Sequence, residues 1–339
     1  MSNSTSLFSK LVSDIQGIGR ARHESKILEY AHYNLAHNEK STRHLPSLPD
    51  HKKQAAILIS AGPSVHRLGQ MEQIKKSCFR GTIICVDGSL IKCLKNGIIP
   101  DFVLTLDPHP SRVVRWFGDP NFEEHTKHDD YFNRQDLDVD FRKNSLHQNN
   151  ENIRLINEYA PNIKLCIASS APPTVTDRVK EAGFDMYWWN PLVDNPQEPE
   201  SLTRQLYQIN KLPCFNTGGN VGTAAWVFAN SILKIKNTAV IGVDLGYYSD
   251  TPMEMTQTYY ELHDYVKTPE ELKTLFPEFV FPLTQEKFYT DPTYYWYRKN
   301  FLDLLQTSGE RAINCTEAGT FFGENVTLLK LKDFLRENA

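Results

Sequence analysis

Two stretches of small residues in this sequence are suited to contacting a phosphate group. Each follows an apolar run and precedes a helix-prone segment, and the second holds three glycines within five positions. Small residues let the backbone approach a ligand closely, and amides at a helix N-terminus attract anions. We therefore predict nucleotide contacts in both stretches, with a common turn and close helix packing as the respective alternatives. The candidates are Gly62, Pro63 and Ser64 in the first stretch and Gly218, Gly219 and Asn220 in the second.

Three aspartates stand at the ends of apolar runs and could carry further chemistry. They are Asp87, Asp107 and Asp244. If the runs are parallel strands, their carboxyl ends meet at one edge of the sheet, where these side chains could converge. Magnesium prefers one or two carboxylates plus phosphate oxygens, so Asp107 and Asp244 are expected to bind a metal or to orient the donor. Asp107 is also a candidate catalytic residue, because it could form an acid–base pair with His109. Asp87 could accept hydrogen bonds from ribose hydroxyls, although it could equally cap the helix that follows.

Two histidines are candidates for the base that deprotonates an acceptor hydroxyl. His109 lies two residues after Asp107 in a loop with two prolines, and His263 lies in the aromatic-rich C-terminal part. An imidazole suits this role because its unperturbed pKa lies near the operating pH. A turn with solvent-exposed polar groups is the alternative explanation for the segment 107–110. A Ser nucleophile is disfavoured, since the sequence has no Gly-x-Ser-x-Gly elbow.

A last group of polar residues follows the final predicted strand. It would add amide, hydroxyl and carboxylate groups to the same edge of the sheet as the aspartates. We count these residues among the candidate nucleotide contacts. They are Asn314, Thr316 and Glu317.

Short apolar runs that alternate with amphipathic, helix-length stretches must position all of these residues. Runs that are apolar throughout are buried on both faces, as in a parallel sheet covered by helices. The pattern predicts an α/β fold with a Rossmann-like, doubly wound, mostly parallel sheet. A helix over about 292–307, a strand over 312–315 and a C-terminal helix from about Val326 are expected after it. The runs that predict strands are 55–60, 82–86, 102–106, 163–168 and 238–243.

The same pattern predicts a core with additions. Residues 1–50 are expected to form a helical N-terminal extension, 55–320 the Rossmann-like domain, and 321–339 a C-terminal helix. A polar insertion at 119–152 is interpreted as a mobile lid or an inert surface excursion, because long loops in compact domains are usually functional or disordered. The aromatic cluster at 294–297 is expected in the core or at an interface, in preference to the alternative of a platform on which a base stacks.

The composition and charge of the sequence exclude several classes of protein. Lys and Arg number 37 against 41 Asp and Glu, and the resulting charge of −4 argues against a nucleic-acid partner. No apolar run is long enough to span a membrane, and the first residues lack the pattern of a secretory signal. The six cysteines include no C-x-x-C pair, which disfavours a zinc site. We expect a soluble, cytoplasmic protein and leave its oligomeric state open.

Several of these motifs occur in an order that resembles one family. Over roughly 55–118 and 160–320, the chain is similar to the MptE-like family, which includes archaeal 6-hydroxymethyl-dihydropterin diphosphokinases and bacterial motility accessory factors (Maf). The resemblance implies a Rossmann-like domain related in fold to CMP-sialic-acid-dependent sialyltransferases. The segments that carry it are Ala61–Ser64, Asp87–Ser89, Leu94–Asp101, Thr105–Asp107, Gly218–Val221, Ile241–Leu245 and Asn314–Gly319.

The two branches of this family imply two activities. Maf proteins are implicated in moving a nonulosonic acid from its CMP-activated form to flagellin, whereas the diphosphokinases move diphosphate from ATP to a pterin alcohol with magnesium. The segments 242–247 and 314–319 look closer to the Maf branch, although Maf proteins are much longer. We therefore expect a nucleotide-dependent transferase, a glycosyltransferase with a CMP-sugar donor and a glycan, protein hydroxyl or small alcohol as acceptor. A magnesium-dependent diphosphokinase and a non-catalytic nucleotide or sugar binder are the alternatives.

Overall fold

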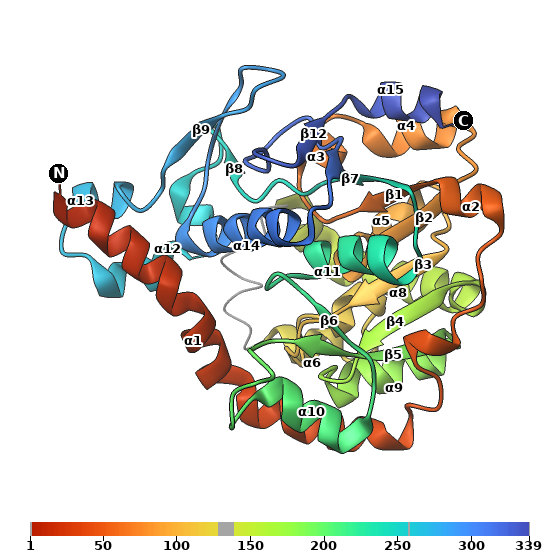
Figure 1. Cartoon of the computed structure of the whole chain (residues 1–339). Coiled ribbons are helices and arrows are strands. Elements are labelled where there is room, and N and C mark those ends of the chain that lie inside the picture. The colour runs from red at the N-terminus through yellow and green to blue at the C-terminus, as the bar shows by residue number, and fades with distance from the viewer. Residues whose placement is uncertain (1, 128–138, 257, 339) are drawn as a thin grey trace.

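A nine-stranded parallel sheet forms the centre of the molecule (Figure 1). The structure is a computed structural model that describes residues 2–127, 139–256 and 258–338. The strand order is β12-β11-β7-β1-β2-β3-β4-β5-β6, and every neighbouring pair is parallel. The strands are β1 Ala55–Ile59, β2 Thr82–Val86, β3 Phe102–Thr105, β4 Lys164–Ala168, β5 Asp185–Leu192, β6 Cys214–Asn216, β7 Asn237–Ile241, β11 Ala312–Asn314 and β12 Val326–Leu328.

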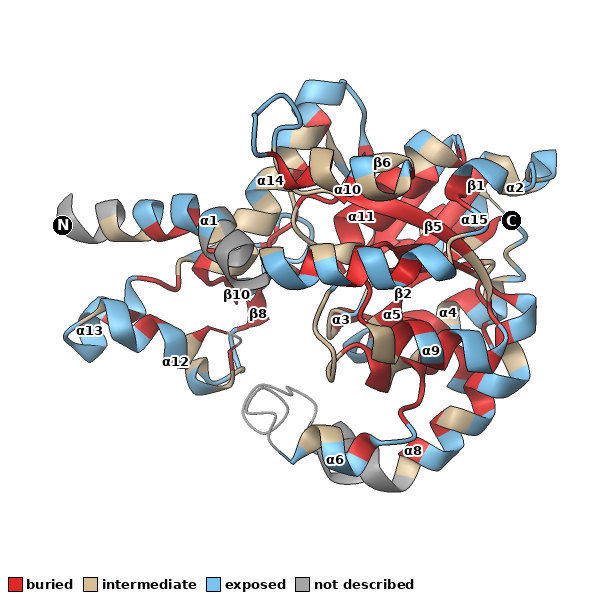
Figure 2. Cartoon of the chain, turned by 90° about the horizontal axis from the view of Figure 1, so that it is seen from below, coloured by how far each residue is buried: buried red, intermediate tan, exposed pale blue. Residues whose placement is uncertain are grey.

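Helices cover both faces of this sheet, and alternate residues of β1 show why. Ile57 and Ile59 pack into a core that includes residues of α5, α9 and α15, whereas Ala56 and Leu58 pack into a second core with α11 and α14. All five residues of β1 are buried, and Figure 2 shows the strands at the middle of the sheet mostly in the colour of buried residues. The helices are α1 Ser2–Tyr33, α2 Asp50–Gln54, α3 Ser64–Arg67, α4 Gln70–Ser77, α5 Asp87–Lys95, α6 Phe122–Thr126, α8 Val139–Tyr159, α9 Pro173–Ala182, α10 Leu202–Asn210, α11 Val221–Val227, α12 Tyr259–Leu262, α13 Pro269–Lys273, α14 Pro292–Ser308 and α15 Leu331–Glu337.

The predicted fold class is confirmed, and its topology marks an edge where ligands bind. The chain builds the sheet outward from β1 to β6, then returns through α11 to add β7 on the other side of β1. The loops after β1 and β7 therefore meet at the point where the strand order reverses. In open α/β sheets, ligands bind outside the carboxyl ends of the strands near such a point.

The long helix α1 joins two distant parts of the molecule. Near its start, Leu11 packs with Tyr247 and Leu262 in a cluster beside α14, and near its end, Ile27 and Ala31 pack against α10. Figure 1 shows α1 running between α13 and α10 along one side of the sheet. The extension expected at 1–50 is thus helical over most of its length and packs on the domain at both ends.

The sequence predicted some segments correctly and others wrongly. The five apolar runs match β1, β2, β3, β4 and β7 to within about two residues, and the helix expected over 292–307 is α14. The C-terminal helix does not begin at Val326, because Val326–Leu328 pairs with β11 as β12 and the helix starts at Leu331. The polar insertion contains α6 and most of α8, which packs on α5, while its residues 128–138 lie outside the described part of the chain.

A small antiparallel sheet lies beside the large one. Its order is β8-β10-β9, and it is surrounded by α12, α13 and one end of α1. Within the described ranges, no helix combines the length and apolarity needed to cross a bilayer. The strands are β8 Tyr247–Tyr248, β9 Glu278–Val280 and β10 Lys287–Tyr289.

Candidate functional site

A cavity of about 970 Å³ opens at the carboxyl ends of β2 to β6. Loops that follow these five strands supply its floor, and α1, α10 and α14 complete its wall. The cavity lies at the carboxyl-end edge of the sheet, where open α/β sheets bind ligands, but beside the β1–β7 reversal and not at it. Its volume is near the upper end of small-molecule sites. The lining of the cavity includes Asp87, Asp107, Arg112, Arg115, Trp116, Gly218, Gly219, Asn220, Trp296, Tyr297 and Asn300.

Asp87 is a buried carboxyl at the floor of the cavity. It is the first residue of α5, directly after β2, and only 7% of its surface is exposed. Burial raises its pKa to about 6, against the opposing effect of hydrogen bonds from Thr105 and the Gly88 amide, and nearby Asp107 raises it further. A carboxyl with this pKa can hold or accept a proton near neutral pH.

Asp107 lies in the same cavity but is exposed. Its Oδ1 accepts a hydrogen bond of 2.8 Å from the amide of His109, which fixes the turn after β3. The structure therefore brings two of the three predicted aspartates, Asp87 and Asp107, to one site.

Two arginines that the sequence analysis did not select line the cavity beside these carboxyls. Arg112 follows the β3 loop, and Arg115 lies three residues later in a short 3-10 helix. Arg115 is buried, and its guanidinium carbon lies 4.4 Å from the centre of the Trp116 ring. Guanidinium groups stay charged and match phosphate geometry, so they can neutralise an anionic ligand here. Their spacing of three residues was the signal available in the sequence.

The glycine-rich loop before α11 borders the cavity, but its amides are already occupied. The amides of Gly218 and Gly219 donate to the side chains of Asn216 and Thr217, and the Asn220 amide donates to the Thr217 carbonyl. A phosphate bound by these three amides would have to displace the loop's own hydrogen bonds. The structure also explains the glycines by close packing, because a Cβ on Gly219 would lie 2.2 Å from a ring carbon of Trp296.

The first small-residue loop packs against the β7 loop instead of the cavity. The Gly62 amide donates to the Gly242 carbonyl at 3.0 Å, and Ser64 Oγ donates to Asp244 Oδ2 at 2.9 Å. Pro63 is the residue before the short helix α3, which begins at Ser64. Gly62 lines a smaller hollow of about 200 Å³, and none of the three is among the residues lining the larger cavity.

Asp244 is held inside this junction. It is 4% exposed, and burial raises its pKa to about 7 although Ser64 donates to it. Its Oδ1 is buried without a hydrogen-bond partner among the described residues. Asp244 does not line the cavity that contains Asp107, so the two proposed magnesium ligands are not brought together there.

A metal site in this chain would rest on few protein ligands. The described ranges contain no group of three or more His, Cys, Asp or Glu side chains placed to hold a metal ion. Magnesium needs only one or two carboxylates when phosphate supplies further oxygens. Asp87 is the carboxyl that shares the cavity with Asp107, and magnesium binding stays a prediction.

The two predicted histidines occupy different parts of the molecule. His109 adjoins the cavity loop, and its Nδ1 accepts a hydrogen bond of 3.3 Å from the Arg112 amide. The neutral imidazole then carries its proton at Nε2, which makes that nitrogen a donor. His263 is exposed, packs on the Tyr259 ring with 4.9 Å between ring centres, and is not among the cavity residues.

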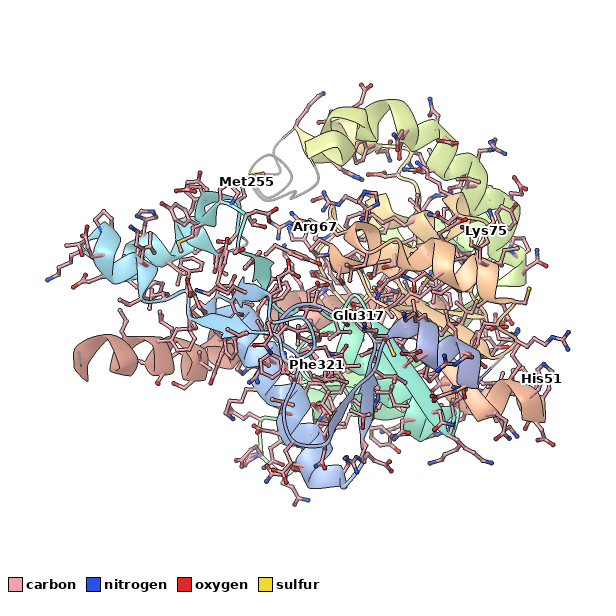
Figure 3. All side chains as sticks on the ribbon, turned by 90° about the horizontal axis from the view of Figure 1, so that it is seen from above. His51, Arg67, Lys75, Met255, Glu317 and Phe321 are labelled. Carbon is pink, nitrogen blue, oxygen red and sulfur yellow. The ribbon has the colours of Figure 1, made fainter. Side chains whose placement is uncertain are left out.

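The three polar residues after β11 hold loops in place. Asn314 Nδ2 donates to the Phe321 carbonyl, and Thr316 Oγ accepts a 3.3 Å bond from the Val243 amide. Glu317, labelled in Figure 3, accepts a 2.9 Å bond from the amide of Leu331, the first residue of α15. None of the three lines the cavity, so their contacts are those of structural residues.

The aromatic cluster at 294–297 was expected in the core or at an interface. Trp296 and Tyr297 instead line the cavity from the first turns of α14. The sequence could not separate these possibilities, since a helix of this composition can bury several of its faces.

Comparison with known proteins agrees with the α/β fold. The family model described as 6-hydroxymethylpterin diphosphokinase MptE-like matches residues 31–123. No curated protein matches the sequence with significance. A Maf glycosyltransferase from Magnetospirillum magneticum AMB-1 is similar in structure, with a TM-score of 0.57 at 15% identity. The similarity covers 93% of this chain but 41% of that protein, so this chain spans less than half of its length.

The matched family segment carries one side of the cavity. Residues 31–123 include both cavity carboxyls, Asp87 and Asp107, and both arginines, whereas the glycine-rich loop and α14 lie beyond it. Over residues 31–123 the chain is similar to the MptE-like family.

Proposed function

We propose that this protein is a nucleotide-dependent transferase that moves a CMP-activated nonulosonic, sialic-acid-like sugar to a hydroxyl acceptor. The observation that carries the proposal is the cavity, where two carboxyls and two guanidinium groups meet at the carboxyl ends of the strands. Its volume of about 970 Å³ leaves room for a nucleotide together with a second reactant. The matched family and the solved neighbour are both named as transferases, which supports this class of reaction.

The donor's phosphate is assigned to the arginine side of the cavity. Arg112 and Arg115 carry permanent positive charge, and Arg115 is fixed by burial and by its stacking on Trp116. The loop at Gly218–Asn220 contacts the donor from the facing side. If magnesium takes part, Asp107 would hold it together with phosphate oxygens, and it would neutralise phosphate charge.

The proton of the acceptor is assigned to Asp87. The acceptor oxygen attacks the anomeric carbon, the bond from that carbon to the CMP phosphate breaks, and CMP leaves with the bonding electrons. The hydroxyl proton passes to the Asp87 carboxylate, whose pKa of about 6 suits this task. His109 remains the candidate from the sequence, and comparison of Asp87→Asn, His109→Ala and His263→Ala identifies the base by loss of turnover.

A diphosphokinase is the second candidate because the matched family model carries that name. In that reaction the hydroxyl of a 6-hydroxymethylpterin-like alcohol attacks the β-phosphorus of ATP, and AMP leaves. The matched segment 31–123 contains both arginines and both carboxyls that such a transfer would use. A non-catalytic nucleotide or sugar binder would use the same cavity without forming a product.

A ligand panel followed by product analysis separates these functions. Thermal shifts are measured with CMP, CDP, ATP, GTP and GDP, each with and without Mg²⁺. Stabilisation by cytidine nucleotides and release of CMP from a CMP-sugar support glycosyl transfer, whereas stabilisation by ATP with Mg²⁺ and AMP formation support diphosphate transfer. Binding without either product would leave only recognition, and no response to any nucleotide would refute the proposal.

A further inference from the structure

Helix α14 is attached to the glycine-rich loop by two side chains one turn apart. A Cβ built on Gly219 would lie 2.2 Å from Cζ3 and 2.5 Å from Cη2 of Trp296, so the indole rests directly on the Gly219 backbone. Asn300 Nδ2 donates to the Gly218 carbonyl at 3.3 Å. These contacts fix the Trp296 ring relative to the loop without any side chain between them.

The rest of the Trp296 ring belongs to the cavity. Trp296 is partly exposed and lines the cavity together with Tyr297, whose ring centre lies 5.4 Å from its own. By contrast, Trp188, Trp189 and Trp226 are buried in the two cores. An indole that packs on the loop backbone with one part of its ring and lines the cavity with another offers a flat apolar surface to the ring of a ligand.

We propose that Trp296, held by the backbone of Gly218 and Gly219, is the stacking site for the planar heteroaromatic ring of the nucleotide. This inference rests on the proposed function, since it assigns the ring end of the ligand whose phosphate end faces Arg112 and Arg115. Stacking of a base on an aromatic side chain contributes about 1–3 kcal/mol, and it accepts any base because every base has a π-face. Trp296 therefore strengthens binding of the ring, and the arginines strengthen binding of the phosphate.

Equilibrium binding to variants that separate the two ends of the ligand tests this assignment. CMP, cytidine and ATP are titrated by calorimetry into the full chain and into its Trp296→Leu, Trp296→Phe and Arg115→Met variants. Trp296→Leu is expected to raise Kd for CMP and for cytidine alike, by roughly 5- to 150-fold. Trp296→Phe keeps a ring and should restore most of the affinity. Arg115→Met should weaken CMP while leaving cytidine nearly unchanged.

Intrinsic fluorescence supplies a second readout with a matched control. Trp116 also lines the cavity, so Trp116→Phe removes an indole from the same space without touching the glycine-rich loop. The fluorescence change on adding cytidine, which lacks the phosphate assigned to Arg115, is expected to disappear in Trp296→Phe and to persist in Trp116→Phe. Melting curves of each variant verify that it is folded before titration.

The outcomes distinguish failure of the stacking site from failure of the proposed transferase function. If folded Trp296→Leu binds the nucleotides with unchanged Kd, or if the fluorescence change follows Trp116, the stacking assignment is wrong while nucleotide dependence stands. If ligands bind through Trp296 and no transfer product forms, the proposed transferase function fails and the stacking site stands. If neither nucleotide nor cytidine binds the unaltered chain, both are refuted.

Discussion

A methyl group added at Gly62 should destabilise the junction between the β1 and β7 loops. In Gly62→Ala the new Cβ would lie 1.6 Å from Asp244 Oδ2 and 2.5 Å from the Gly242 carbonyl oxygen. The Gly242 oxygen is backbone and has little freedom to move, so the Asp244 carboxyl must shift and lose its hydrogen bond from Ser64. Overpacking lowers the free energy of unfolding by about 1–3 kcal/mol, and loss of the buried hydrogen bond to the Asp244 carboxyl lowers it by about as much again.

These magnitudes predict a measurable drop in melting temperature. With an unfolding entropy of about 2.1 cal/mol/K per residue, 339 residues give about 0.7 kcal/mol/K, so a loss of about 4 kcal/mol lowers Tm by about 6 °C. Circular dichroism at a fixed scan rate measures it. Gly17→Ala is the matched control, because a Cβ there meets no atom within 4 Å and alanine has a higher helix propensity than glycine inside α1. This variant should therefore not lower Tm.

A double-mutant cycle shows whether Asp244 is the cause. In an Asp244→Ala background the clash with the carboxyl is removed, so Gly62→Ala should cost less than it does in the unaltered chain. If Gly62→Ala melts within about 1 °C of the unaltered protein, or if its effect is the same in both backgrounds, the argument from close packing is refuted.

Three further predictions concern a buried acid, a cavity cation and a helix cap. Because burial raises the pKa of Asp244 from 3.8 to about 7, the folded state keeps a proton that the unfolded chain has lost. The contribution of Asp244 to the free energy of unfolding should therefore fall by up to about 4 kcal/mol as pH rises from 4 to 7. Asp244→Asn should remove this contribution, which urea titrations at each pH would measure. If the free energy of unfolding changes with pH equally in both proteins, the prediction is contradicted. Arg115→Met keeps an apolar contact with Trp116 but loses the charge, so calorimetry should find Kd for a nucleotide raised by roughly 10- to 100-fold. Arg67→Met, outside the cavity, is the control. An equal loss of nucleotide affinity in that variant would indicate a general effect of charge and contradict the prediction. Asn220 Oδ1 accepts a 2.9 Å hydrogen bond from the Thr223 amide at the start of α11. Asn220→Ala should therefore lower the free energy of unfolding by about 1 kcal/mol, as measured by chemical denaturation. Ser201→Ala at the N-cap of α10 is the comparison, and no change in either variant would refute the prediction.

The sequence predicted the central sheet because burial on both faces leaves an unbroken apolar pattern. The runs at β1 to β4 and at β7 have that pattern, whereas β6 has only three residues and β5 contains Pro191, so both were missed. β12 was assigned to a helix, since Val326–Leu328 is too short to show a period. Local pattern alone identifies strands that are apolar throughout, and it fails for very short strands and for strands interrupted by polar residues or proline.

The candidate site was harder to predict because its parts are far apart in the sequence. Asp87, Asp107 and the glycine-rich loop were selected for standing after strands, and they do meet at one cavity. Asp244 stands at an equivalent position but points into the junction with Ser64. Position after a strand thus predicts which edge a side chain reaches, while its neighbours decide whether it faces ligand or interior.

Helix α1 has a consequence for the order in which the molecule folds. It packs on α10 and α14, whose residues follow it by some two to three hundred positions, and Ile15 and Ile27 help to line the cavity. Contacts between such distant segments form slowly, because a long loop must close before they stabilise the chain. During synthesis α1 is made before α10 and α14 and must wait for both, so we expect the complete cavity to form late in folding. A peptide that competes for α14 would then act on the nascent chain and leave the finished protein unaffected.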